Sequence, residues 1–264
     1  MEGQIAESSR VDNYPGIPGI DGYSLGEKFR EHAESLGVEF TEAQVLSLGQ
    51  KDGIWIIGCD EDITLESKAV IYATGCKNRP LGVPGEEKYY GRGLSFCAVC
   101  DGAFYKGKRV AVIGGGDTAL DDAMYLSDIC EKVYLVHRRE FFRGSASTLE
   151  KLKQKENVEI IVNARVEEIT GDKKIDGIIL DNKTKLNISG LFAAVGMIPQ
   201  TELLKEFGVL DESNYVKASE DTKTTVNGLF AAGDVRTKQL RQVVTAAADG
   251  ANAIYSVMEY LRNI

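Results

Sequence analysis

The sequence has no long apolar run, little histidine and no excess of positive charge. None of its apolar runs approaches the roughly 20 residues that cross a bilayer, and its first ten residues lack the charged start and apolar middle of a signal peptide. Its 31 lysines and arginines are outnumbered by 40 aspartates and glutamates, which gives a net charge of −9. Because no basic stripe interleaved with aromatics offsets this charge, we expect a cytoplasmic protein with neither nucleic acid nor a membrane as partner.

Only two of the five cysteines lie close together. Cys97 and Cys100 are separated by two residues, a spacing found both in redox-active disulfides and in half of a zinc site. A zinc site needs two further ligands at comparable spacing, whereas the other cysteines are isolated and the chain has two histidines. On the first turn of a helix the dipole lowers a thiol pKa and readies the pair for exchange. We therefore predict a redox pair and interpret Cys59, Cys76 and Cys130 as packing residues.

Short β-branched runs alternate with amphipathic stretches, as a parallel sheet with crossover helices requires. With 264 residues, 43% of them hydrophobic, the chain is long enough for two domains. The near repeat of LFAAVG at 191–196 and LFAAGD at 229–234 is what two similar nucleotide-binding folds produce, although six residues can also coincide by chance. We predict strands at 70–73, 110–113, 133–136, 159–162, 175–180, 191–195 and 229–232, and helices at 25–36, 117–127, 147–154 and 243–261.

A glycine loop, GGGDTA at 114–119, stands between a predicted strand and a predicted helix and indicates a dinucleotide-binding turn. Gly114 permits the tight turn, Gly116 lets the backbone approach the pyrophosphate, and Ala119 lets the helix pack close to the strand. Asp117 and Thr118 then lie at the helix N-terminus, where phosphate binds. On its own such a loop is weak evidence, because glycine turns also join ordinary strands and helices.

The second strand of this unit is followed by basic residues. In a dinucleotide fold an acidic side chain here binds the ribose of NAD, and a basic one accommodates the 2′-phosphate of NADP. His137, Arg138 and Arg139 occupy this position, and the guanidinium of Arg143 can add bidentate contacts to phosphate. The charge favours NADPH over NADH, whereas taken alone the run is more often a solvated surface cluster.

Taken together, the motifs resemble the low-molecular-weight thioredoxin reductases, two-domain flavoproteins that pass electrons from NADPH through FAD to a disulfide and on to thioredoxin. The resemblance extends from near the first residue to near the last, with the motifs in the family's order. It rests on NYPG at 13–16, ATG at 73–75, CAVCDG at 97–102, GGGDTA at 114–119, HRREFFR at 137–143, residues 196–201, AAGDV at 231–235 and RQV at 241–243.

The resemblance implies roles for individual residues. Cys100 is expected to exchange electrons with the flavin, Cys97 to attack the disulfide of thioredoxin, and Asp101 to act as general acid. A carboxyl group beside an attacking and a leaving thiolate can supply the proton that the exchange needs. Without the cysteines, Asp101 is interpreted as a turn or cap residue. The residues implied for FAD are Gln4, Asn13, Thr74, Gly75, Gly233, Asp234, Val235, Arg241, Gln242 and Val243.

The resemblance also implies an α/β fold with two Rossmann-like domains and a homodimeric assembly. The FAD domain is expected at 1–79 and 197–264, and the NADPH domain, which carries the cysteine pair, at 80–196. Because the cysteine pair and the glycine loop share one domain, a fixed arrangement can hardly press both the disulfide and the nicotinamide against one flavin. The family rotates one domain on the other, through connections that fall here near 79–84 and 196–199.

One motif of the family is not found. No GxGxxG or GxGxxA loop occurs upstream of Gly114, whereas the family has such an FAD-binding loop, in a unit of about 30 residues or more, near its start. We therefore expect an FAD domain that is N-terminally incomplete. The alternatives to a thioredoxin reductase are a flavin-deficient fragment, a non-catalytic NADP-binding remnant, and the reductase of a peroxiredoxin or another thioredoxin-like partner.

Overall fold

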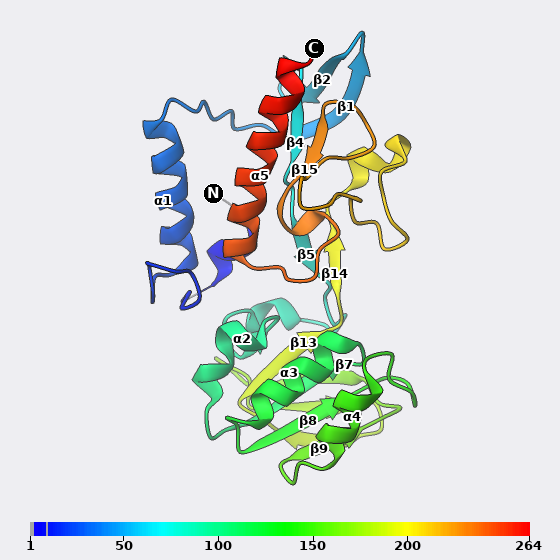
Figure 1. The fold of residues 1–264 in the computed structure, drawn as a ribbon. Helices are drawn as coiled ribbons and strands as arrows, with labels where there is room; N and C mark the ends of the chain where they lie inside the picture. The colour runs from blue at the N-terminus through cyan, green and yellow to red at the C-terminus, as the bar shows by residue number, and fades with distance from the viewer. Residues whose placement is uncertain (1–2, 9) are drawn as a thin grey trace.

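Two short strands join two bodies of secondary structure in the computed structural model of the chain, which describes residues 3–8 and 10–264 (Figure 1). The joining strands are β5 (Cys76–Asn78) and β14 (Met197–Pro199), which pair antiparallel. One body contains a five-stranded sheet, and the other contains the C-terminal helix (Figure 1). The chain therefore passes between the bodies twice, at β5 and at β14, whereas the resemblance places the two connections near 79–84 and 196–199.

The first body is built on a parallel sheet with the strand order β6-β13-β7-β8-β9. Along β7, Val110 and Val112 belong to one buried apolar cluster, whereas Ala111 and Ile113 belong to another. Burial on both faces explains why this strand is an almost uninterrupted apolar run. The strands are β6 (Leu94–Ser95), β7 (Arg109–Gly114), β8 (Lys132–Val136), β9 (Val158–Ile161) and β13 (Gly190–Ala194).

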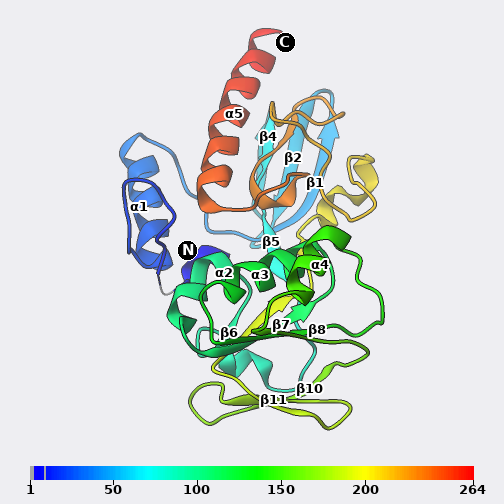
Figure 2. The same cartoon turned by 60° about the horizontal axis from the view of Figure 1, so that its bottom comes forward.

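Helices cover one face of this sheet, and a three-stranded antiparallel meander covers the other (Figures 1 and 2). Leu120 and Leu126 of α3 are fully buried on the helical side, and Ile178 and Leu180 fill the meander side. The covering elements are α2 (Ala98–Asp101), the 3-10 helix η3 (Gly102–Tyr105), α3 (Asp117–Ser127), α4 (Ala146–Lys153), β10 (Val166–Thr170), β11 (Gly177–Leu180) and β12 (Lys185–Asn187).

The second body combines a parallel strand pair, a three-stranded antiparallel sheet and the C-terminal helix. Its core surrounds Trp55, which is fully buried against Phe207. The elements are β1 (Val45–Lys51), β2 (Ile54–Cys59), β3 (Thr64–Ser67), β4 (Val70–Tyr72), β15 (Leu229–Ala231), α5 (Val243–Arg262) and the 3-10 helices η4 (Glu202–Phe207) and η5 (Gly233–Val235). The 3-10 helix η2 (Glu86–Tyr89) belongs to the first body, where Tyr89 packs in the same cluster as Ile178.

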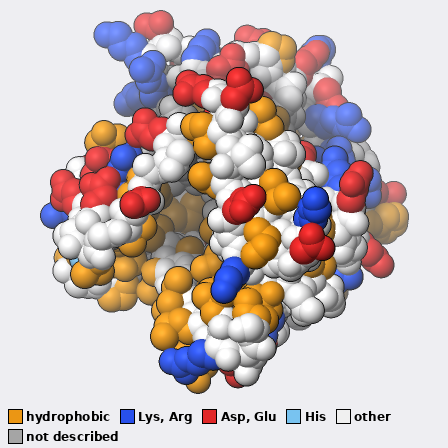
Figure 3. All heavy atoms as spheres, turned by 90° about the horizontal axis from the view of Figure 1, so that it is seen from above, with side chains coloured by type: hydrophobic (Ala, Val, Ile, Leu, Met, Phe, Trp, Pro, Cys, Tyr) orange, Lys and Arg blue, Asp and Glu red, His pale blue; other side chains and the backbone are white. Residues whose placement is uncertain are grey.

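Helix α1 (Gly22–Ser35) stands apart from the strands of the second body (Figures 1 and 2). It begins where the side chain of Asp21 accepts a hydrogen bond from the backbone N–H of Ser24, and it packs on η1 (Gln4–Glu7). Figure 3 shows a hollow beside it, bordered by apolar side chains. Both α1 and α5 expose apolar side chains, among them Tyr23 and Tyr255.

The predicted α/β class with a parallel sheet is confirmed. The predicted helix 117–127 coincides with α3, and the helix predicted at 243–261 is α5, which ends one residue later. The helix predicted from residue 25 begins at Gly22, because Asp21 caps it there, and the strand predicted from residue 175 begins at Gly177. The sequence analysis missed the β1-β2-β3 sheet, because its half-exposed strands lack a clear alternation of apolar and polar residues.

Candidate redox-active site

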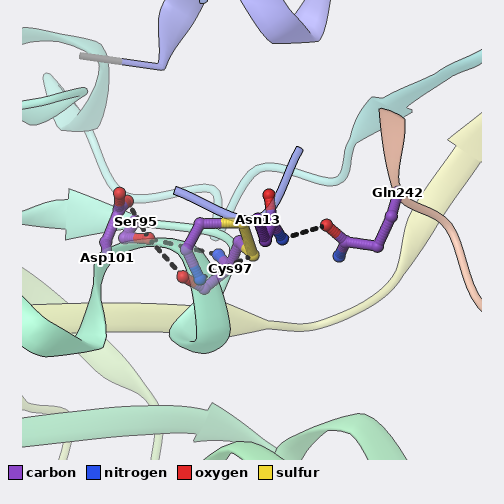
Figure 4. Close-up of a disulfide and its surroundings, with 6 residues drawn as sticks. Asn13, Ser95, Cys97, Asp101 and Gln242 are labelled. Atoms are coloured by element: carbon purple, nitrogen blue, oxygen red, sulfur yellow. Dashed lines mark hydrogen bonds between the residues drawn. A yellow bond between two sulfur atoms is a disulfide. The ribbon is translucent and has the colours of Figure 1, made fainter. Parts of the chain in front are cut away.

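Cys97 and Cys100 form a disulfide at the start of the short helix α2 (Figure 4). Cys97 is the N-cap residue, and its Sγ atom accepts a hydrogen bond of 3.2 Å from the backbone N–H of Cys100. Ala98 is fully buried and anchors the turn, whereas Val99 is 58% exposed. The pair therefore lies at the surface of the first body, within reach of another molecule.

The two buried free cysteines differ from the disulfide pair in reactivity. Cys76 and Cys130 are free and buried, and burial raises the pKa of each to about 11. They are protonated at neutral pH and are therefore poor nucleophiles. Cys59 is free and partly exposed.

Asp101 ends α2, and its carboxylate is held by Ser95 from strand β6 (Figure 4). The Ser95 hydroxyl donates a hydrogen bond of 2.6 Å to Oδ2 of Asp101 and accepts one of 3.1 Å from the backbone N–H of Cys97. Burial raises the pKa of Asp101, and the bond from Ser95 opposes the shift. A carboxyl group with a raised pKa holds its proton to a higher pH, as a general acid must. The sequence analysis missed Ser95, whose only signal is a small polar residue two positions before Cys97.

The glycine loop is closely packed at Gly114 and open at Gly116. A Cβ atom added to Gly114 would lie 2.4 Å from the carbonyl oxygen of Ala194 and 2.7 Å from Cβ of Ala119. At Gly116 the space is open, with no atom within 4 Å of such a Cβ. Gly116 is also the N-cap of α3, and in the described chain no side chain caps this helix. An uncapped helix N-terminus beside open space fits the phosphates of a dinucleotide.

The basic loop is fastened to the glycine loop. The carbonyl oxygen of Gly115 accepts hydrogen bonds from the backbone N–H groups of Arg143, at 2.7 Å, and Gly144, at 3.2 Å. The carboxylate of Asp117 accepts a third from the backbone N–H of Ser145, at 2.7 Å. These bonds fix the loop beside the N-terminus of α3. The exposed guanidinium groups on this loop are those of Arg138, Arg139 and Arg143.

His137 has a different position from its basic neighbours. It is buried, Phe141 offers a carbonyl oxygen 3.2 Å from its Nε2 atom, and its ring lies 4.8 Å from that of Phe142. A Cβ atom on Gly115 would lie 2.2 Å from the imidazole. Burial lowers the pKa of His137, and the neighbouring arginines lower it further, so the ring is neutral at pH 7. The structure thus places His137 beneath the glycine loop, and its contact with a cofactor stays a prediction.

Two sets of hydrogen bonds involve residues predicted to bind FAD. The amide of Asn13 donates a hydrogen bond of 2.8 Å to the side-chain oxygen of Gln242, which precedes α5 (Figure 4). The Thr74 hydroxyl donates a hydrogen bond of 2.7 Å to the carbonyl oxygen of Gln200, and the backbone N–H of Gln200 donates to the carbonyl oxygen of Gly75. Segments more than 200 residues apart in sequence are therefore joined here.

Asp234 carries a buried oxygen, Oδ1, that has no hydrogen-bond partner among the described residues. The Nε2 atom of Gln4 is also buried without a hydrogen-bond partner among the described residues. Burial raises the pKa of Asp234, and the positive charges of Lys238 and Arg241 lower it. A buried polar atom without a partner costs about 1–3 kcal/mol. The two atoms fit a ligand that offers hydroxyl donors and carbonyl acceptors, as the ribityl chain and ring of FAD do.

Asp249 holds the turn that presents Asp234. It is 2% exposed, and its carboxylate accepts hydrogen bonds of 2.8 Å from the backbone N–H of Gly233 and 2.7 and 2.8 Å from the guanidinium of Arg236. Lys238 donates a further bond of 2.8 Å. Gly233 has a φ of +76°, a conformation that favours glycine. The sequence analysis missed Asp249, although an acidic residue in the apolar helix after 243 is a signal.

Comparison with known families adds to this geometry. The model of the pyridine nucleotide-disulphide oxidoreductases matches residues 3–250. The chain belongs to this family. It is 40% identical to a thioredoxin reductase of Helicobacter pylori over 273 aligned residues, which cover 99% of the chain and 88% of that relative.

Solved structures of other family members resemble the chain to different degrees. The thioredoxin reductase of Streptococcus pyogenes is 37% identical and superposes with a TM-score of 0.91, covering 99% of this chain and 87% of its own. The thioredoxin reductase of Lactococcus lactis in its FR conformation is 35% identical, with coverages of 99% and 88%, but its TM-score is 0.66. Nearly equal identity with unequal superposition is what a changed placement of two bodies produces.

The two glycines of the loop generate a matched prediction. Gly116→Ala adds its methyl group to open space, so we expect an unchanged melting temperature but NADPH binding weakened at least about tenfold, because the methyl group fills the phosphate position. Gly115→Ala forces a methyl group onto His137, so we expect the melting temperature itself to fall. Thermal unfolding and calorimetric titration with NADPH check both. Unimpaired binding by Gly116→Ala would contradict the assignment of the loop.

Proposed function

We propose that the chain is an NADPH-dependent thioredoxin-disulfide reductase, the activity named for its relatives in Helicobacter pylori and Streptococcus pyogenes. The observation that carries the proposal is the partly exposed Cys97–Cys100 disulfide, on the same body as a glycine loop followed by a basic loop. The partner is thioredoxin or a thioredoxin-like protein. The proposal includes a cytoplasmic location and a homodimer. In the described part of the chain no helix is long and apolar enough to cross a bilayer.

In the proposed reaction the reduced cysteine pair delivers two electrons to the partner. The Cys97 thiolate attacks one sulfur of the partner disulfide, that S–S bond breaks, and the leaving sulfur takes the electron pair and a proton from Asp101. The Cys100 thiolate then attacks Sγ of Cys97, which re-forms the intramolecular disulfide and releases the partner's second sulfur, which takes up the second proton. Two thiols of the chain are oxidised, and one disulfide of the partner is reduced.

The cofactors are NADPH and FAD. When bound, NADPH would supply a hydride, and FAD would carry its two electrons to the disulfide. Gly114, Gly116, Asp117, Thr118 and Ala119 form the proposed phosphate site of NADPH, and His137, Arg138, Arg139 and Arg143 the proposed support for its 2′-phosphate. The proposed FAD contacts are Gln4, Asn13, Thr74, Gly75, Gly233, Asp234, Val235, Arg241, Gln242 and Val243.

We propose that residues 1–79 and 197–264 form the FAD domain and residues 80–196 the NADPH domain. The β5–β14 pair then joins the two domains. Because the disulfide and the glycine loop belong to the same domain, the two must take turns at one flavin, and rotation about this pair provides the exchange. The unequal TM-scores of relatives at nearly equal identity support two placements of the domains.

The basic clamp predicts cofactor preference. Arg138→Ala with Arg139→Ala removes two charged hydrogen-bond donors from the 2′-phosphate, and we expect NADPH affinity to fall about tenfold or more while NADH affinity stays the same. Calorimetric titration with each nucleotide measures the two affinities. Arg165→Ala, another exposed arginine, serves as the control. An equal loss for both nucleotides would show that the clamp does not read the phosphate.

The cysteine pair predicts the activity itself. Supplied with FAD and NADPH, the chain is expected to reduce thioredoxin, and Cys97→Ser or Cys100→Ser to abolish this, because neither variant can form the intramolecular disulfide. Cys59→Ser, at a free cysteine, should keep the activity. Insulin turbidity follows reduced thioredoxin. Activity that survives Cys97→Ser would contradict the proposal. Reduction of a peroxiredoxin but not of thioredoxin would show that the partner is a peroxiredoxin.

A further inference from the structure

Ser95 places one buried hydroxyl between the two ends of the cysteine turn. It is 5% exposed and sits in β6, where it pairs with Phe192 of β13 at the edge of the five-stranded sheet. Its Oγ atom lies 2.6 Å from Oδ2 of Asp101, 3.1 Å from the backbone nitrogen of Cys97 and 3.4 Å from the carbonyl oxygen of Cys97 (Figure 4). The Oγ atom of Ser95 therefore connects strand β6 to both Cys97 and Asp101.

The contacts form a closed ring. The backbone N–H of Asp101 donates a hydrogen bond of 3.1 Å to the same carbonyl of Cys97 that Ser95 approaches. A serine hydroxyl carries one proton, so it donates to one acceptor at a time. Two acceptors compete for it, the Asp101 carboxylate and the Cys97 carbonyl.

We propose that Ser95 is a positioning residue that links the protonation of Asp101 to the hydrogen bonding of Cys97. When Asp101 is ionised, the Ser95 hydroxyl donates to its carboxylate, and the Cys97 carbonyl keeps only the bond from the Asp101 N–H. When Asp101 is protonated, its own O–H no longer needs a donor, and the Ser95 hydroxyl turns to the Cys97 carbonyl. No proton leaves Ser95 in either state.

The consequence for the exchange step rests on the proposed function. As Asp101 gives its proton to a leaving thiolate, its carboxylate forms and draws the Ser95 hydroxyl away from Cys97. When Asp101 takes up a proton from water, the hydroxyl returns. The hydrogen bonding of the turn that carries the attacking cysteine thus changes in each transfer, and Ser95 holds the Asp101 carboxylate only while it is ionised.

The other groups around Asp101 are few and identifiable. Tyr105 on η3 lies close enough that the negative charge of Asp101, after burial, raises the pKa of its hydroxyl. From α3, which packs on α2, the ring of Tyr125 lies beside Gly102, the residue after Asp101, and α3 also carries Asp122. Burial, followed by the charge of Asp121, raises the pKa of Asp122 to about 7. Asp122 therefore titrates in the neutral range, and the experiment needs a variant that removes it.

The test measures reduction of the Cys97–Cys100 disulfide by dithiothreitol from pH 5 to 9, in the chain without FAD or NADPH. Each rate is divided by the concentration of dithiothreitol thiolate at that pH. The remaining pH dependence then comes from groups of the protein. With Ser95→Ala we expect the midpoint of this profile to move to higher pH by about one to two pH units, because Asp101 stays buried but loses its donor. Ser95→Thr keeps the hydroxyl and is expected to restore the wild-type midpoint.

Two further variants serve as controls. Ser127→Ala removes another buried hydroxyl, one that donates to the Met124 carbonyl inside α3, and is expected to leave the midpoint unchanged. Asp122→Asn identifies any limb of the profile that belongs to Asp122. A Ser95→Ala profile that superimposes on the wild type, or an equal shift in Ser127→Ala, would overturn the proposal.

A measurement on the unaltered chain covers the case in which Ser95→Ala does not fold. The carbonyl carbon of Cys97 is expected to titrate, in carbon-13 NMR spectra, with the same midpoint as the Asp101 carboxyl. A Cys97 carbonyl signal that ignores this midpoint contradicts the link. The proposed function fails separately: a linked titration in a chain that reduces no thioredoxin leaves the role of Ser95 intact.

Discussion

The cysteine pair and the glycine loop are carried by the same parallel sheet, and this shared support constrains the rest of the molecule. Strand β6 leads into Cys97, and β7 leads into Gly114, with β13 between them in the sheet. On the proposed function, a hydride donor and a disulfide on one body must reach a flavin on the other body in turn. The two bodies are joined by the two-stranded β5–β14 connection.

Buried charge organises each side of this joint differently. On the second body Asp249 satisfies the turn at Gly233 and neutralises Arg236 and Lys238, while Asp234 keeps an oxygen without a protein partner. Removing Asp249 would leave Lys238 without its ion pair and Arg236 with only the exposed Glu220, a loss of about 3–5 kcal/mol. On the first body the arginines are exposed, and backbone bonds to Gly115 hold their loop. The charges around Asp249 are thus paired within the protein, whereas Asp234 and the exposed arginines of the first body keep charge that a ligand could pair with.

The sequence predicts the parts whose patterns are local. Strand, glycine loop and helix at 110–127 follow from apolar periodicity and glycine geometry, and the short spacing of Cys97 and Cys100 predicts their pairing. Contacts between distant segments are not predictable in this way. The bond from Asn13 to Gln242 joins residues 229 positions apart, and Ser95 becomes important only because β6 brings it beneath the cysteine turn. His137 looks like a clamp residue in the sequence, yet the fold buries it under Gly115.

The central claim is that one chain holds a flavin within reach of both the nicotinamide and the disulfide. The visible absorption spectrum tests it most directly, recorded after FAD is added and the excess removed, and again after anaerobic addition of NADPH. The account predicts retained flavin bands that bleach with NADPH, and weaker retention by Asp234→Ala, which removes the unpartnered carboxylate. A chain that retains no flavin, or retained flavin that NADPH does not bleach, would contradict the account.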